Sequence, residues 1–267
     1  MTSLLTAVRA IAEDAGRLIL EHYARPFEVE YKADDSPLTI ADSGSHALIV
    51  ARLAELTPDI PVLSEEGEPE AADRAGWTRF WCIDPLDGTK EFVKRTGEFT
   101  VNIALVEAGR PVLGVVHVPA LDRTYSAVVG QGAWRADAGG APSPIRTRAA
   151  DPRRLTVVAS RDHAGPEVAA MVDAMRAAGV GVELTSMGSA LKFCLVAEGA
   201  ADFYPRTGPT MEWDTAAAQA VVEAAGGAVK TLDGRPLGYN KASLRNPPIV
   251  TAGDPGLDWR RFVQSSS

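Results

Sequence analysis

The sequence predicts a mixed α and β protein whose two halves are built differently. Three observations lead to this class. The chain starts with an amphipathic helical segment, continues with strands joined by very short turns, and after residue 150 alternates short strands with helices. With 267 residues, 46% of them hydrophobic and 23% charged, it is long enough to bury a sizeable core as one large or two modest domains.

The first segment, 3–24, is predicted to be a helix with one face on the core. Its apolar residues recur at spacings of three and four, as one face of a helix requires: Leu4, Leu5, Val8, Ile11, Ala12, Ala15, Leu18 and Ile19. A second helix is predicted over 43–56, and the segment 28–31 alternates weakly as a strand would.

Three β-rich runs follow, over 99–107, 111–118 and 124–129. Only a few turn residues separate one run from the next, and connections that short predict an antiparallel meander.

The segment 135–154 is rich in Ala, Gly, Pro and Arg, and marks the predicted boundary between subdomains 1–145 and 146–267. Beyond it, strands and helices alternate, which predicts an α/β second half. The strands are expected over 155–159, 180–184 and 201–204, and the helices over 165–178, 189–199 and 214–225.

Charge and composition exclude several functional classes. A net charge of −8 and a pI of about 5.1 argue against general affinity for nucleic acid or an anionic membrane. No run approaches the length of about 18 apolar residues that a membrane helix needs. Cys82 and Cys194 both lie in apolar runs, which favours buried, reduced thiols and a cytoplasmic protein.

The stretch Asp84-Pro85-Leu86-Asp87-Gly88-Thr89 ends the apolar run Phe80-Trp81-Cys82-Ile83. By itself it predicts a reverse turn, with Pro85 presetting φ and Gly88 taking a positive φ. The two aspartates also make it a candidate cation site, and local sequence leaves both interpretations open.

Other acidic residues occupy similar positions. Glu65-Glu66 follows the apolar run 60–63, and Asp214 stands at the start of an Ala-rich helix. Taken singly, Glu65-Glu66 fits a solvated loop, while Asp214 and Asp42 fit helix N-caps.

These carboxylates acquire another meaning if Glu65, Asp84, Asp87 and Asp214 converge. Two like charges about 4 Å apart repel by about 4 kcal/mol at an effective dielectric constant of about 20. No equally placed cluster of Lys or Arg is visible in the sequence to balance four of them. An all-oxygen set favours Mg²⁺ over Zn²⁺, and the sequence has neither HExxH nor CxxC spacing.

Other catalytic motifs fail. There is no P-loop, and Ser189-Ala190-Leu191-Lys192 fits S-x-x-K without the partner motifs of a β-lactamase-like enzyme. Gly188-Ser189 is better explained as a helix start that receives a phosphate, with Lys192 pointing back toward that end, or as an ordinary cap. Arg206 is either a phosphate-binding fork or a surface arginine.

The complete set of motifs resembles one family. It is similar to the inositol monophosphatase-like superfamily of Mg²⁺-dependent phosphatases, and within it to the 3′(2′),5′-bisphosphate nucleotidases of the bacterial sulfate-assimilation type. The resemblance extends from about residue 30 to 250, with 135–154 matching poorly. It rests on these segments: 35–42 (DSPLTIAD), Glu65-Glu66, 84–92 (DPLDGTKEF), 160–163 (SRDH), 188–194 (GSALKFC) and Trp213-Asp214.

The resemblance implies a fold and an activity. The fold is a five-layered αβαβα sandwich, with an antiparallel N-terminal sheet and a mixed C-terminal sheet. The activity is Mg²⁺-dependent, Li⁺-sensitive removal of the 3′-phosphate of adenosine 3′,5′-bisphosphate, which gives AMP, and of the 3′-phosphate of its sulfated form. The implied partner is a small phosphorylated nucleotide bound by a monomer or homodimer, with no nucleic acid or membrane involved.

The resemblance also implies roles for individual residues. Glu65, Asp84, Asp87, Asp214 and the Leu86 carbonyl are expected to hold about two or three Mg²⁺ ions. Thr89, Asp42 and Glu65 are the expected catalytic residues, with the Thr89 hydroxyl passing the proton of the attacking water toward Asp42. The expected substrate-binding residues are Gly88, Thr89, Lys32, Ser160, His163, Gly188, Ser189, Lys192 and Arg206.

Three rival functions stay open. An inositol monophosphatase or fructose 1,6-bisphosphatase would use the same chemistry on another substrate. A non-catalytic sensor on the same fold would not need the pair Thr89 and Asp42. A serine hydrolase acting through Ser189 would keep its activity in EDTA.

Overall fold

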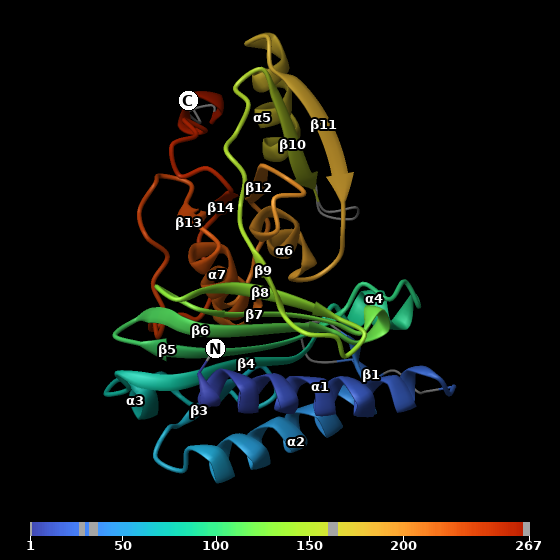
Figure 1. Cartoon of the computed structure of the whole chain (residues 1–267). Coiled ribbons are helices and arrows are strands. Elements are labelled where there is room, and N and C mark those ends of the chain that lie inside the picture. The colour runs from blue at the N-terminus through green and yellow to red at the C-terminus, as the bar shows by residue number, and fades with distance from the viewer. Residues whose placement is uncertain (1, 27–29, 32–36, 160–164, 264–267) are drawn as a thin grey trace.

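The two larger sheets and three layers of helices alternate in the structure (Figure 1), and β1 and β2 form a separate two-stranded sheet. The computed structural model describes residues 2–26, 30–31, 37–159 and 165–263. From one side to the other, the layers are α1 with α2, a seven-stranded sheet, α6 with α7, a five-stranded sheet, and α5. This confirms the five-layered αβαβα sandwich that the resemblance implied.

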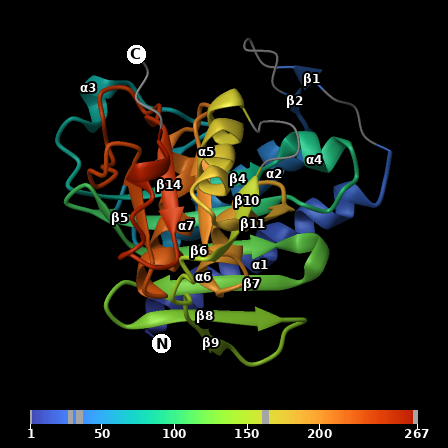
Figure 2. The ribbon, with the colours of Figure 1, turned by 90° about the horizontal axis from the view of Figure 1, so that it is seen from above.

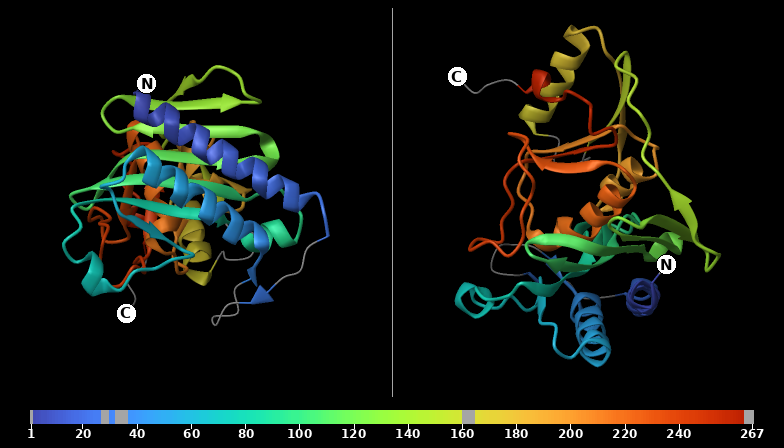
Figure 3. Two further views of the ribbon diagram at one scale, coloured as in Figure 1. Left: turned by 90° about the horizontal axis from the view of Figure 1, so that it is seen from below. Right: turned by 60° about the vertical axis from the view of Figure 1, so that its left-hand side comes forward.

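The first layer consists of α1 (Ser3–Tyr23) and α2 (Ile40–Leu56), which lie side by side across one face of the larger sheet (Figure 3). Six of the eight residues of the predicted apolar stripe are buried, and Leu4 and Leu18 are half-buried, so the predicted helix is confirmed. Helix α2 begins three residues before its predicted start, because Thr39 caps it and the Asp42 carboxylate accepts a hydrogen bond from the Thr39 backbone N–H.

The seven-stranded sheet has the strand order β3-β4-β5-β6-β7-β8-β9 and is antiparallel except between β3 and β4. Its middle strands are the predicted meander, shifted by at most one residue at either end. Strands β8 and β9 occupy part of the predicted linker 135–154, which therefore extends the sheet rather than leaving it. The bounds in order are Val62–Ser64, Arg79–Asp87, Thr100–Glu107, Arg110–Val118, Arg123–Val128, Gly132–Asp137 and Ser143–Ile145.

Helices α6 (Leu191–Ala197) and α7 (Glu212–Ala224) fill the space between the sheets. The five-stranded sheet beyond them has the order β11-β10-β12-β14-β13, with parallel pairing on one side and antiparallel pairing on the other. Strands β13 and β14 were not predicted. The bounds from β10 to β14 are Arg154–Ala159, Gly181–Ser186, Phe203–Arg206, Ala228–Thr231 and Ile249–Ala252.

The outer layer is α5 (Pro166–Ala177), which lies over the five-stranded sheet when the molecule is viewed from above (Figure 2). None of the helices in the described part of the chain combines the length and apolar character of a membrane-crossing segment. The shorter elements are β1 (Glu30–Tyr31), β2 (Pro37–Leu38), α3 (Ala71–Arg74), α4 (Thr89–Val93), η1 (Pro119–Leu121) and η2 (Arg260–Phe262).

Three clusters of buried apolar side chains fill the spaces between the layers. The largest joins α6 and α7 to strands of both sheets, so the two halves of the chain share a core. The division into subdomains 1–145 and 146–267 stays a prediction.

Candidate active site

The stretch around Asp84 is a bulged strand rather than the predicted reverse turn. Strand β4 stays paired with β5 through Asp87, where Asp84 faces Asn102 and Asp87 faces Thr100. Three steps along β4 thus match two steps along β5, which is the extra residue of a β-bulge. Side chains three residues apart in a regular strand point to opposite faces, and the bulge brings Asp84 and Asp87 to the same face.

The core clusters confirm this change of face. Phe80 and Cys82, at even positions before the bulge, pack on the side of α7, whereas Leu86 packs on the side of α1 and α2. Gly88 follows at φ +94 and opens α4, and a Cβ there would lie 3.2 Å from both the Glu98 carbonyl and the Ser189 Cβ. The positive φ predicted for this glycine is therefore confirmed.

Asp84 is a buried carboxylate, with 1% of its surface exposed. Its Oδ1 accepts a hydrogen bond from the Leu86 backbone N–H at 3.1 Å. Burial raises the pKa of Asp84 well above its usual value, and the charges of Glu65, Asp87, Asp214 and Asp42 raise it further. The predicted carboxylates therefore gather around Asp84 and act on one another.

Asp214 lies in the first turn of α7, at the third helical position rather than at the predicted N-cap, which is Met211. Its Oδ2 accepts from the Met211 backbone N–H at 2.8 Å. Burial raises the pKa of Asp214 to about 8, with further contributions from Asp87 and Glu65.

Glu65 directly follows β3, and its backbone N–H donates to the Ile83 carbonyl on β4 at 3.3 Å. This bond places it beside the end of β4, and its charge raises the pKa of both Asp84 and Asp214. Its neighbour Glu66 raises the pKa of Asp42 instead.

The donor chemistry of this cluster fits a hard metal ion. In Asp84, Asp87 and Asp214, backbone N–H groups bind one carboxylate oxygen, and the hydrogen bonds found among the described residues leave the other oxygen available. Among the described residues, no three or more His, Cys, Asp or Glu side chains lie in an arrangement that could itself hold a metal ion. The fit therefore rests on oxygen ligands and buried like charges.

Asp42 and Thr89 are in direct contact. Thr89 Oγ1 lies 3.1 Å from Asp42 Oδ1 and 3.3 Å from the Leu86 carbonyl. Burial raises the pKa of Asp42, while hydrogen bonds from Thr39 partly offset that effect. Helix α2 also holds the bulge through Ser45, whose hydroxyl donates to the Pro85 carbonyl at 2.8 Å.

The start of α6 differs from the predicted phosphate-binding helix terminus. The helix begins at Leu191, and Ser189 adopts a positive φ of 44°. Within this turn, the Ala190 N–H donates to Asp87 Oδ2 at 2.7 Å. A donor that the sequence assigned to a substrate phosphate is thus already bound to a carboxylate.

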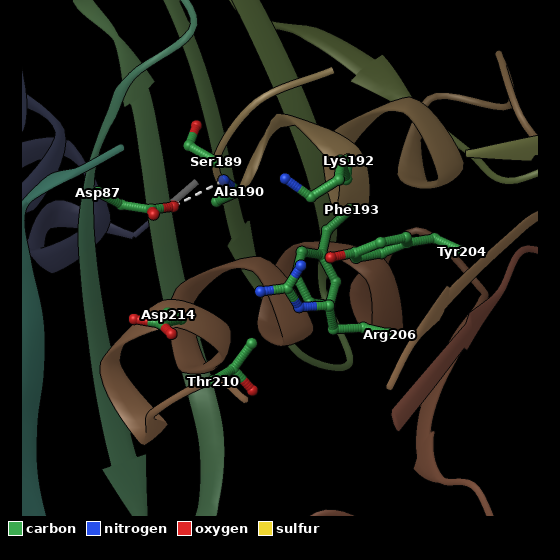
Figure 4. A pocket seen from close by; sticks show the side chains of 9 residues that line it. All are labelled: Asp87, Ser189, Ala190, Lys192, Phe193, Tyr204, Arg206, Thr210 and Asp214. Atoms are coloured by element: carbon green, nitrogen blue, oxygen red, sulfur yellow. Dashed lines mark hydrogen bonds between the residues drawn. The ribbon is translucent and has the colours of Figure 1, made fainter. Parts of the chain in front are cut away.

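A solvent-open pocket with an empty volume of about 330 Å³ lies beside Asp87 and Asp214 (Figure 4). Lys192 and Arg206 extend into it from the opposite side, and their charges lower the pKa of Asp87 and Asp214 respectively. The resemblance implied that both cations bind substrate, and in the structure both line the pocket beside the acidic cluster. The lining residues are Asp87, Ser189, Ala190, Lys192, Phe193, Tyr204, Arg206, Thr210 and Asp214.

Lys192 is buried, with 7% of its surface exposed, and burial lowers its pKa while Asp87 raises it. Its Nζ donates to the Met187 carbonyl at 3.4 Å, back toward the start of α6. Ser189 Oγ and Arg206 Nε are buried and have no hydrogen-bond partner among the described residues. Polar atoms are thus available in this pocket for a ligand.

Three predicted substrate-binding residues, Lys32, Ser160 and His163, lie outside the described residues. Sequence reasoning missed Tyr204 and Thr210, which line the pocket. It also missed Thr100 and Asn102, which contact Asp87. The sequence signal for Thr100 and Asn102 was the presence of two polar side chains at alternate positions in the mainly apolar strand β5.

Comparisons with known proteins agree with this geometry. A model of the inositol monophosphatase family matches residues 1–255. The chain is 49% identical over 247 residues to the 3'(2'),5'-bisphosphate nucleotidase CysQ of Escherichia coli, covering 91% of this chain and 97% of that protein. Identity to the nucleotidase CysQ of Haemophilus influenzae is 36% over 264 residues, covering 98% and 97%. The crystal structure of CysQ from Bacteroides thetaiotaomicron matches with a TM-score of 0.82 at 44% identity, covering 94% and 97%.

Proposed function

The chain belongs to the inositol monophosphatase family, whose enzymes depend on metal ions, and from this premise we propose that it is a 3′(2′),5′-bisphosphate nucleotidase. It hydrolyses the 3′-phosphate of adenosine 3′,5′-bisphosphate, and of its sulfated form, leaving the 5′-substituent in place. The observation that carries this function is a buried carboxylate cluster beside a pocket with two cationic side chains.

The residues that would hold the metal, about two or three Mg²⁺ ions, are Glu65, Asp84, Asp87, Asp214 and Leu86 through its carbonyl. These ligands are all oxygens, and the free oxygens of three of the carboxylates support the assignment. When bound, such ions supply positive charge beside the phosphate and acidify a water molecule for attack on phosphorus.

Thr89 and Asp42 move the proton of that water. The Thr89 hydroxyl has one proton and two acceptors nearby, and the nearer one is Asp42 Oδ1 at 3.1 Å. With its proton directed to Asp42, Thr89 Oγ1 presents a lone pair to the attacking water. Thr89 thus acts as a relay, and Asp42 is the acceptor.

The substrate lies with its scissile phosphate at the carboxylates and its second phosphate in the adjoining pocket. Lys192, Arg206 and Ser189 supply the donors there, which supports an anion carrying more than one phosphate. The segment at Gly88 and the segment at Gly188 both pass close to the Glu98 carbonyl. A Cβ on either glycine would lie within 3.2 Å of that carbonyl, so glycine at both positions lets the segments approach.

One assay tests this function against its rivals. Phosphate release is measured from adenosine 3′,5′-bisphosphate, inositol 1-phosphate and fructose 1,6-bisphosphate, each with Mg²⁺, with EDTA, and with millimolar Li⁺. We expect kcat/KM for the nucleotide to exceed the other two by at least about tenfold, with activity lost in EDTA. A lead below tenfold would overturn the substrate, and activity in EDTA would point instead to hydrolysis through Ser189.

A further inference from the structure

The carboxylate of Asp87 is held from one side. Its Oδ2 accepts the Ala190 backbone N–H at 2.7 Å and the Asn102 side-chain amide at 3.3 Å, with the Thr100 hydroxyl at 3.4 Å. The hydrogen bonds that Asp87 accepts from the described residues all end on this oxygen, so Oδ1 is directed away from them. Because a carboxylate is planar, fixing Oδ2 also restricts the direction in which Oδ1 points.

Thr100 and Asn102 form a small polar unit inside an apolar strand. They lie in β5 directly across from Asp87 and Asp84, and have 0% and 1% of their surface exposed. The Thr100 hydroxyl lies 3.1 Å from Asn102 Oδ1. Donation to that oxygen turns the Asn102 amide nitrogen toward Asp87, so the threonine fixes the orientation of the asparagine.

Two buried polar side chains at alternate positions of a core strand reduce stability unless their hydrogen bonds are satisfied. A purely structural pair would bond only to each other or to backbone groups. Here the Thr100 hydroxyl donates to Asn102, and the Asn102 amide donates to a carboxylate of the acidic cluster, which is the arrangement of groups that orient a metal ligand.

We propose that Asn102 and Thr100 are positioning residues that aim Asp87 Oδ1 at the metal, an inference that rests on the proposed function. Neither touches the substrate or the metal. Asn102 acts on Asp87 directly, and Thr100 acts through Asn102.

The test is Mg²⁺ binding to the metal-free protein, measured by calorimetry, together with thermal unfolding. Asn102→Leu removes the amide, Thr100→Val removes the hydroxyl at nearly constant shape, and Thr100→Ser keeps the hydroxyl. The matched control is Thr124→Val, because Thr124 is a buried threonine of the same sheet whose hydroxyl bonds to His117 and Glu13 and not to a carboxylate of the acidic cluster.

We expect Asn102→Leu to raise the Kd for Mg²⁺ by about tenfold or more, and Thr100→Val by about threefold to tenfold. Thr100→Ser should stay within about twofold of wild type, and Thr124→Val should lower Tm without changing the Kd. An unchanged Kd in Thr100→Val would overturn the inference even if Asn102→Leu fails to fold. So would a rise in Kd in Thr100→Ser or Thr124→Val as large as the rise in Thr100→Val. If wild type itself does not bind Mg²⁺, the proposed function fails instead.

Discussion

Thr89 Oγ1 lies 3.1 Å from Asp42 Oδ1, although the two residues are 47 positions apart in the chain. The contact forms because both residues lie in the first turns of helices: Asp42 in α2 and Thr89 at the first position of α4. Ser45 of α2 fixes the distance by binding the Pro85 carbonyl between them. Helix α2 therefore carries Asp42, the proposed proton acceptor, and is also hydrogen-bonded to the end of β4, which carries Asp84 and Asp87.

The relay predicts different outcomes for two substitutions of Thr89. Thr89→Val removes the hydroxyl and should lower kcat by about 10²–10⁴-fold, the usual contribution of positioned proton transfer. Thr89→Ser keeps the hydroxyl and should retain most of the activity. Steady-state phosphate release at saturating Mg²⁺ checks both, and equal losses in the two variants would show that the hydroxyl has no part in proton transfer.

The acidic cluster predicts a pH dependence of stability in metal-free protein. Burial and neighbouring carboxylates raise the pKa of Asp214 from 3.8 to about 8, so between these values the folded chain binds more protons than the unfolded chain. The free energy of unfolding in EDTA should therefore fall as pH rises from about 4 to about 8.

Thermal unfolding at several pH values with EDTA checks this dependence. Asp214→Asn should flatten it, whereas Asp173→Asn, which changes an exposed aspartate of α5, should leave it unchanged. A Tm that rises over this pH range in EDTA would contradict the account of the acidic cluster.

The pocket beside Asp87 predicts a change in substrate preference. Lys192→Met keeps the length of the side chain and removes its charge, and hydrogen bonds to charged groups contribute about 1.5–3 kcal/mol. The KM for adenosine 3′,5′-bisphosphate should rise by about 10- to 100-fold. The KM for inositol 1-phosphate, which lacks a second phosphate, should change far less, and equal changes for the two substrates would exclude this role.

An ion pair between a buried carboxylate at the start of α7 and a half-buried lysine predicts a loss of stability. Glu212 has 0% of its side chain exposed and accepts from Lys241 Nζ at 2.6 Å. Lys241→Met should lower the free energy of unfolding by about 3–5 kcal/mol, because it leaves a buried carboxylate without its counter-ion.

Denaturant unfolding measures this loss. The exposed pair Arg154–Glu183, with a separation of 2.9 Å, supplies the control. Arg154→Met should change the free energy of unfolding by less than about 1 kcal/mol. Similar losses in Lys241→Met and Arg154→Met would show that burial does not decide the contribution of these pairs.

Much of the fold could be predicted because its signals are local. The spacing of apolar residues identified α1, and short turns identified the antiparallel meander from β5 to β7. Strands β8, β9, β13 and β14 were missed because their own sequences are short or rich in turn residues. They form by pairing with neighbouring strands, which the local sequence does not show.

For the site, the sequence predicted which residues take part but not how they are arranged in space. The identities of the acidic residues indicated oxygen ligands for a cation, and the family resemblance supplied their order along the chain. The bulge between Asp84 and Asp87 could not be foreseen, because it depends on which residues of β5 lie opposite them. For the same reason, the donation from Ala190 to Asp87 and the placement of Lys192 and Arg206 required the folded chain.

The most direct test of the central claim is phosphate release by Asp87→Asn with adenosine 3′,5′-bisphosphate and Mg²⁺. The asparagine side-chain oxygen can still accept from Ala190 and Asn102, which places its amide nitrogen where Oδ1 was, so a metal ligand is removed while the fold is kept. We predict that the circular dichroism spectrum of Asp87→Asn matches that of wild type, while its activity falls by several orders of magnitude. Activity within a few-fold of wild type would contradict a metal-dependent phosphatase built on this acidic cluster.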